Sequence, residues 1–219
     1  HRDLHSFPTR RSSDLFLLRN NGILEQASQR FAQSKWIVLT LGTSWVYKER
    51  SNGKIVSNCH KLPDSFFERE LMEPHEIFSL IDRCIKENPG KRWIITVSPV
   101  RHLKDGANGN QLSKARLLLA TERLLKEHDN VFYFPAYEVF MDELRDYRFY
   151  ASDLLHPSQE AVQYIWELFM KFAIDKTCFD RIRLIKELNN LRNHRVLFPG
   201  SEEHKKLLEK IEILEKRLV

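Results

Sequence analysis

The chain has 219 residues, of which 42% are hydrophobic and 30% are charged, and its net charge is +5 at pH 7. This length allows one α/β domain with a sizeable core, and the composition excludes the disordered and fibrous classes. Basic residues are spread along the chain, so a nucleic-acid partner is not expected. No apolar run approaches transmembrane length, so we expect no membrane span either.

The cysteines indicate a reducing environment. Cys59, Cys84 and Cys178 cannot all pair with one another, and none belongs to a Cys-x-x-Cys motif. A disulfide framework or a structural zinc site is therefore not expected. We expect a cytoplasmic location on this ground.

The first fifteen residues, HRDLHSFPTRRSSDL, are basic, poor in aliphatic side chains and unlike the periodic sequence that follows. The part SFPTRRSSDL is what one reading frame of a widely used sequencing-adapter oligonucleotide encodes. We therefore expect residues 1–15 to be an artefact of that kind and to be disordered. On this interpretation the biological chain starts near Phe16, in mid-protein.

The first half of the chain alternates between helical and strand patterns. Residues 22–33 have helical spacing, and the run WIVLTLG at 36–42 is typical of a strand buried on both faces of a parallel sheet. Residues 46–56 predict a hairpin that turns at 51–53. Residues 64–87 have helical periodicity, and Pro74 opens a second helix within them.

The second half continues this alternation, with strands at 92–100 and 131–140 and helices at 110–128 and 158–174. Alternating strands and helices predict an open α/β sheet. Residues 176–219 differ, because they predict a helical hairpin that turns near 198–201. Its apolar stripe would face the body or a partner chain, and a homodimer is possible through these helices; the stripe consists of Leu207, Leu208, Ile211, Leu214 and Leu218.

Polar residues follow each predicted strand, at the edge where ligands bind to open α/β sheets. One such group is Asp153-Leu-Leu-His156. Its three-residue spacing lets the carboxylate accept the imidazole Nδ1–H and leaves Nε2 free as a base. The same pattern also fits a turn cap before a helix, so DxxH alone leaves both interpretations open.

Six longer strings occur in order: TLGTSWVY (40–47), SNCHKLP (57–63), VSPVRHLKDG (97–106), NQLSKA (110–115), YFPAYEVFMDELRDYRFY (133–150) and DLLHPS (153–158). In these strings the chain resembles the GSCFA family, a branch of the SGNH/GDSL hydrolase-like superfamily. The resemblance implies a three-layer α/β/α fold with a mostly parallel sheet over residues 16–175, incomplete at the N-terminus. It also implies that Asp153 and His156 are the acid and the histidine of a catalytic triad.

The family's name quotes its nucleophile motif, Gly-Ser-Cys-Phe-Ala, and the chain contains no such string. The resemblance therefore implies a serine-dependent esterase or acyltransferase whose serine lies upstream of Phe16, so that the chain as written is inactive. It implies a small-molecule or glycan ester as substrate, and no metal or organic cofactor. The alternative is a non-catalytic domain of this fold that binds an acylated or glycan ligand or a protein partner.

The resemblance also suggests residues that bind the oxyanion. Superfamily members follow a strand with Gly-x-Asn, whose backbone N–H or side-chain amide helps to bind the oxyanion. Here Gly42 matches the glycine, but Ser44 stands at the asparagine position. Asn58 could supply the missing amide, or it could cap a turn.

Other polar residues near the strand ends have open roles. Cys59 and His60 suggest a thiol–imidazole pair, but neighbours in an extended segment point in opposite directions, so Cys59 is either a nucleophile or a small buried cysteine. His60 is retained as a candidate binding residue. Arg101 and His102, with Lys104, could bind a carboxylate or phosphate of the substrate, or could cap strand and helix ends.

Overall fold

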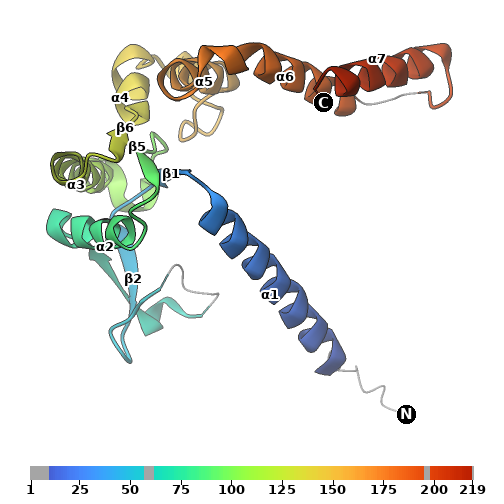
Figure 1. Ribbon diagram of the computed structural model, residues 1–219. Helices are drawn as coiled ribbons and strands as arrows, with labels where there is room; N and C mark the ends of the chain where they lie inside the picture. Colours follow the sequence, from blue (N-terminus) through green and yellow to red (C-terminus); the bar gives the residue numbers. More distant parts are fainter. Residues whose placement is uncertain (1–9, 57–61, 195–197, 219) are drawn as a thin grey trace.

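The computed structural model describes residues 10–56, 62–194 and 198–218. The chain is a mixed α/β protein, as the alternating patterns predicted (Figure 1). Its strands are β1 (Trp36–Leu41), β2 (Trp45–Glu49), β3 (Ile55–Val56), β4 (Phe67–Leu71), β5 (Arg92–Val97) and β6 (Val131–Tyr133). Its α-helices are α1 (Arg10–Gln33), α2 (Pro74–Lys86), α3 (Gly106–Glu127), α4 (Ala136–Glu138), α5 (Gln159–Ala173), α6 (Phe179–Arg192) and α7 (Glu202–Leu218).

A parallel sheet with the strand order β1-β5-β6 forms the centre of the protein. Helices α2 and α3 pack together on one face of it (Figure 1). Apolar residues recur at helical spacing along α2, which gives that helix one continuous buried face. This face joins the strand side chains in the main core, which includes Ile77, Ile81, Ile85, Trp93, Ile95, Val97, Leu117 and Leu124.

The opposite face of the sheet is covered only in part. Ile165, Leu168 and Phe169 of α5 pack on a small cluster around Ile94 and Phe134. On β1, however, exposed and half-buried residues alternate, and Trp36 and Val38 are 46% and 54% exposed. The prediction that 36–42 is buried on both faces is therefore wrong: β1 is an edge strand of the described sheet, and only its α2/α3 face is covered.

Strands β2, β3 and β4 form a separate antiparallel sheet. The predicted hairpin at 46–56 is present, and its turn uses Gly53 at a φ of 69°. Residues 67–71 form β4, although helical periodicity had been assigned to 64–87. Pairing with β2 outweighs that local pattern, because strand preference depends on cross-strand neighbours. Pro74 begins α2, as predicted.

The third strand of the parallel sheet is shorter than predicted. It was expected to span 131–140, but β6 ends at Tyr133. Pro135 lacks a backbone N–H and cannot continue the sheet hydrogen bonds. The chain turns there into α4 and then into a π-helical turn (Val139–Glu143).

The N-terminal helix α1 begins at Arg10, well before the predicted start at residue 22. Residues 1–9 of the segment expected to be disordered lie outside the described residues, whereas 10–15 are helical. No proline lies between Pro8 and Gln33, so the helix can extend toward the N-terminus from 22–33. Helix α1 projects away from the sheet, and its apolar side chains Leu17, Leu18, Ile23 and Leu24 are exposed (Figure 1).

The C-terminal segment folds into the helical hairpin that the sequence predicted (Figure 1). Leu188 of α6 and Leu214 of α7 are buried, and ion pairs join Arg192 to Glu215 at 2.6 Å and Lys210 to Glu187 at 3.0 Å. Of the predicted apolar stripe of α7, Leu214 is buried in the packing of α6 against α7, whereas Leu208 is 53% exposed. None of the described helices is both long enough and apolar enough to cross a bilayer.

Candidate functional site

The loop that contains Asp153 and His156 is tightly closed. Tyr150 and Pro157 form an isolated bridge, and the Ala151 N–H donates to the His156 carbonyl at 2.8 Å. Leu154 adopts a φ of 57°, a left-handed conformation that costs a non-glycine residue roughly 1–2 kcal/mol. Ser158 then caps α5 through the Ala161 N–H. The start of α5 and the closed loop thus hold the two side chains together.

The predicted hydrogen bond between the two side chains is present. His156 Nδ1 lies 2.6 Å from Asp153 Oδ2, and Asp153 Oδ1 accepts the backbone N–H groups of Leu155 and His156 at 2.9 and 3.0 Å. An imidazole held at Nδ1 by a carboxylate presents Nε2 as the free base. Within the described part of the chain, no hydroxyl or thiol bonds that Nε2. The side chains of His156 and Asp153 are 60% and 44% exposed.

The hydrogen bonds to Asp153 should be visible in a pH titration of its carboxyl group. The backbone N–H of His156, followed by its ring and the N–H of Leu155, lowers the pKa of Asp153 from 3.8 to about 2. We expect the Asp153 carboxyl ¹³C resonance to titrate near pH 2. The stabilising effect of the pair is complete above pH 3.8 and is lost as the pH falls toward 2.

The variant His156→Ala keeps the backbone N–H, which is the largest cause of this shift. In that variant the midpoint for Asp153 should rise but stay below 3.8. A midpoint near 3.8 in the native chain would mean that the carboxylate does not make these bonds in solution.

Lys114 joins the loops that follow β1 and β5. Its side chain is 1% exposed, and its Nζ donates to the carbonyl oxygens of Gly42 and Ser98, each at 2.6 Å. Burial lowers the pKa of Lys114 to about 8. In the described residues no carboxylate lies within ion-pair distance of it. Lys114 therefore fixes both loops at the carboxyl edge of the sheet.

Ser44 lies beneath this edge and not on it. Its side chain is buried, its backbone N–H donates to Ser113 Oγ at 2.8 Å, and its hydroxyl donates to the Ser113 carbonyl at 3.2 Å. Both polar groups of Ser44 thus serve to attach β2 to α3. The imidazole of His102 lies near the backbone of Gly42. Burial is the main cause that lowers the pKa of His102, and the charge of Lys114 lowers it further.

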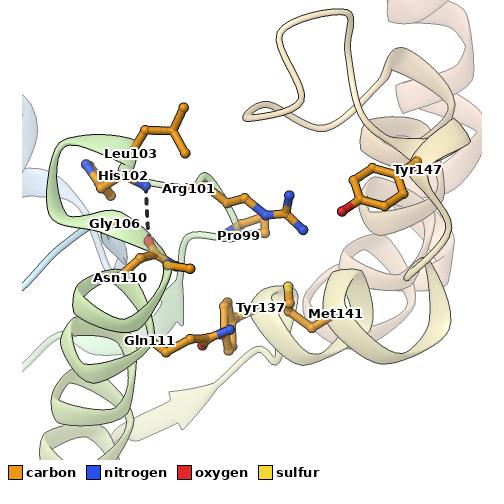
Figure 2. Close-up of a pocket in the computed structure, with 11 residues that line it drawn as sticks. Pro99, Arg101, His102, Leu103, Gly106, Asn110, Gln111, Tyr137, Met141 and Tyr147 are labelled. Carbon is orange, nitrogen blue, oxygen red and sulfur yellow. Dashed lines mark hydrogen bonds between the residues drawn. The ribbon is translucent and has the colours of Figure 1, made fainter.

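A cavity of about 280 Å³ opens between the loop after β5, the start of α3 and the segment that follows β6. Figure 2 shows the side chain of Arg101 extending across it toward Tyr147. The backbone N–H of Arg101 contacts the Leu155 carbonyl at 3.4 Å, and its Nη2 donates to the Tyr150 hydroxyl at 2.5 Å. Arg101 thus connects the cavity to the loop of Asp153 and His156, which lies beside it.

Asn58, Cys59 and His60 lie outside the described residues. The amide suggested for the oxyanion and the thiol alternative therefore stay predictions. Cys84 and Cys178 are free and exposed. No group of three or more His, Cys, Asp or Glu side chains in the described ranges could hold a metal ion.

Sequence reasoning assigned no role to Lys114 or Tyr150, which both contribute to this edge. A signal for Lys114 was present. The buried positions of α3 are Asn110, Ser113, Lys114, Leu117, Ala120, Thr121 and Leu124, at helical spacing, and the lysine falls on that face. Tyr150 has no comparable sequence signal, because its partner Arg101 comes from a distant loop.

A comparison with protein-family models now adds to this geometry. The model of the GSCFA family matches residues 1–169. The chain belongs to the GSCFA family. The matched range of the GSCFA domain includes residues 1–15, so it does not set that segment apart, and it stops before the C-terminal hairpin. A search of curated proteins found no match.

Proposed function

We propose that this GSCFA protein is a serine-dependent ester hydrolase or acyltransferase of the SGNH type. The observation that carries the proposal is the 2.6 Å contact of His156 Nδ1 with Asp153 Oδ2, at the carboxyl edge of a parallel sheet. Helices on both faces of that sheet are compatible with the three-layer arrangement of such enzymes. Since a fold hosts many functions, the proposal rests on the site.

In the proposed reaction, His156 Nε2 takes the proton of a serine hydroxyl as the serine oxygen attacks the ester carbonyl. Asp153 stabilises the imidazolium that forms. His156 then gives this proton to the leaving alcohol as the ester C–O bond breaks, which leaves an acyl-enzyme. Water, or an acceptor alcohol in a transferase, attacks the acyl group by the same route. Gly42 would donate its backbone N–H to the oxyanion, held in place by Lys114.

The nucleophile is proposed to lie in a segment upstream of Phe16 in the intact protein. Three observations support this. Among the described residues no hydroxyl bonds His156 Nε2, the Asp153–His156 pair is exposed to solvent, and Trp36 and Val38 leave apolar surface uncovered on β1. Additional chain packed on this side would cover both the strand and the pair.

A fluorophosphonate probe tests this proposal, because it reacts covalently with activated serines. A protein extended with the natural upstream segment should be labelled at one serine, as measured by intact mass and peptide mapping. The 219-residue chain should remain unlabelled. Labelling of neither protein, when both are folded by circular dichroism, would favour the alternative of a non-catalytic binding domain, whereas labelling of the shorter chain would contradict an upstream nucleophile.

A further inference from the structure

Arg101 has the features of an anion-binding side chain. Its guanidinium lies 4.2 Å from the ring centre of Tyr150 and 5.9 Å from that of Tyr147. Its side-chain hydrogen bond goes to a neutral group, the Tyr150 hydroxyl. Among the described residues no carboxylate lies within ion-pair distance of it. A half-buried guanidinium of this kind usually pairs with a carboxylate or phosphate.

The walls of the cavity limit the charge of the ligand. None of its lining residues is acidic, and Arg101 is the one guanidinium or ammonium group among them. His102 also lines it, but burial lowers the pKa of this imidazole, which favours the neutral form. One positive charge matches a carboxylate monoanion better than a phosphate dianion, which calls for several cationic groups.

The remaining walls suit a small organic ligand. Tyr137 donates its hydroxyl to Gln111 Oε1 at 2.6 Å, which orients the Gln111 amide, and Asn110 Oδ1 accepts the His102 N–H at 3.0 Å (Figure 2). Both amide NH₂ groups remain able to donate to a ligand. Tyr147 and Met141 supply aromatic and apolar surface. At about 280 Å³, the cavity is at the small end of ligand pockets.

We propose that this cavity binds the carboxylate of an anionic substrate through Arg101, so that the ester acted on carries a carboxylate group. Calling this ligand a substrate rests on the proposed hydrolase function. The binding of a carboxylate to Arg101 does not depend on that function. The contacts of Arg101 with Leu155 and Tyr150 join this cavity to the loop that carries His156. Arg101 would then select esters by charge.

Benzoate and benzamide are suitable probes, because they have nearly the same shape and differ in charge. In the 219-residue chain at pH 7, we expect benzoate to bind with a dissociation constant on the order of 1 mM, measured from amide shifts of Ala107 and Gln111 in ¹H–¹⁵N NMR. Benzamide should bind at least about tenfold more weakly. Inorganic phosphate should bind more weakly than benzoate at the same residues.

Arg101→Met should weaken benzoate binding at least about tenfold, and Arg101→Lys should weaken it less, because a lysine keeps the charge but not the paired donors. Arg148→Met is the matched control. Arg148 follows the cavity residue Tyr147 and stacks on Phe149, but it does not line the cavity, so benzoate binding should be unchanged.

Equal affinity for benzamide and benzoate, or full benzoate affinity in folded Arg101→Met, would overturn the proposal. Tighter binding of phosphate would replace the carboxylate assignment. If benzoate binds to the 219-residue chain but the fluorophosphonate probe labels neither that chain nor the extended protein, the hydrolase proposal fails and the carboxylate site stands.

Discussion

His156→Ala, made in a protein extended with the proposed upstream segment, is expected to lower kcat/KM for p-nitrophenyl acetate by about 10⁴-fold or more. Without the imidazole, the serine proton has no acceptor within reach and the leaving alcohol has no donor. Asp153→Asn should cost about 10⁴-fold, because an amide no longer selects the tautomer with Nε2 free. The measurement is the initial rate of nitrophenol release at fixed concentrations of folded protein.

The chain provides a matched control for this experiment. His128 and Asp82 form a second His–Asp pair, with Nε2 2.8 Å from Oδ1, but His128 precedes β6 and so lies near the amino ends of the strands. His128→Ala should leave kcat/KM within about threefold of the native value, since ligands bind at the carboxyl ends. Cys59→Ala should also retain activity. If Cys59→Ala abolishes hydrolysis while His156→Ala retains more than a tenth of it, the assignment of the triad fails and the thiol alternative gains support.

Lys114 should make the stability of the protein depend on pH in the alkaline range. A pKa lowered from 10.5 to about 8 corresponds to about 3 kcal/mol between the two protonation states. Between these pH values the unfolded chain holds the proton and the folded chain does not, so the free energy of unfolding rises with pH. The advantage of the native chain over Lys114→Met should therefore grow by about 2 kcal/mol between pH 7 and pH 10.

Urea denaturation of both proteins at the two pH values measures this difference, and the comparison cancels the titration of all other groups. Lys126→Met is the control on the same helix, because Lys126 is exposed and paired with Glu122. Its difference from the native chain gives the effect of removing an exposed lysine at each pH. A difference for Lys114→Met that does not change between pH 7 and pH 10 would show that the buried ammonium keeps its ordinary pKa.

Short-range spacing determined what could be predicted about this protein from its sequence. The alternation of strands and helices, the turn at Gly53, the start of α2 at Pro74 and the Asp153–His156 hydrogen bond each depend on residues a few positions apart. Such features form from local backbone geometry, and the sequence carries them directly. For the same reason the helical hairpin at 176–219 was predictable from its apolar spacing.

The tertiary structure decided the features that depend on distant segments. Residues 67–71 have helical spacing but form β4, because pairing with β2 satisfies their backbone groups. The run at 36–42 has no alternation of polar and apolar residues that would mark an exposed face, yet Trp36 and Val38 are exposed, because burial depends on which elements cover a face. Lys114 and Arg101 belong to residue types that are usually exposed. Lys114 is buried where it bonds Gly42, 72 positions away in the sequence. Arg101 lies beside the loop of Asp153 and His156 because it bonds Tyr150, 49 positions away.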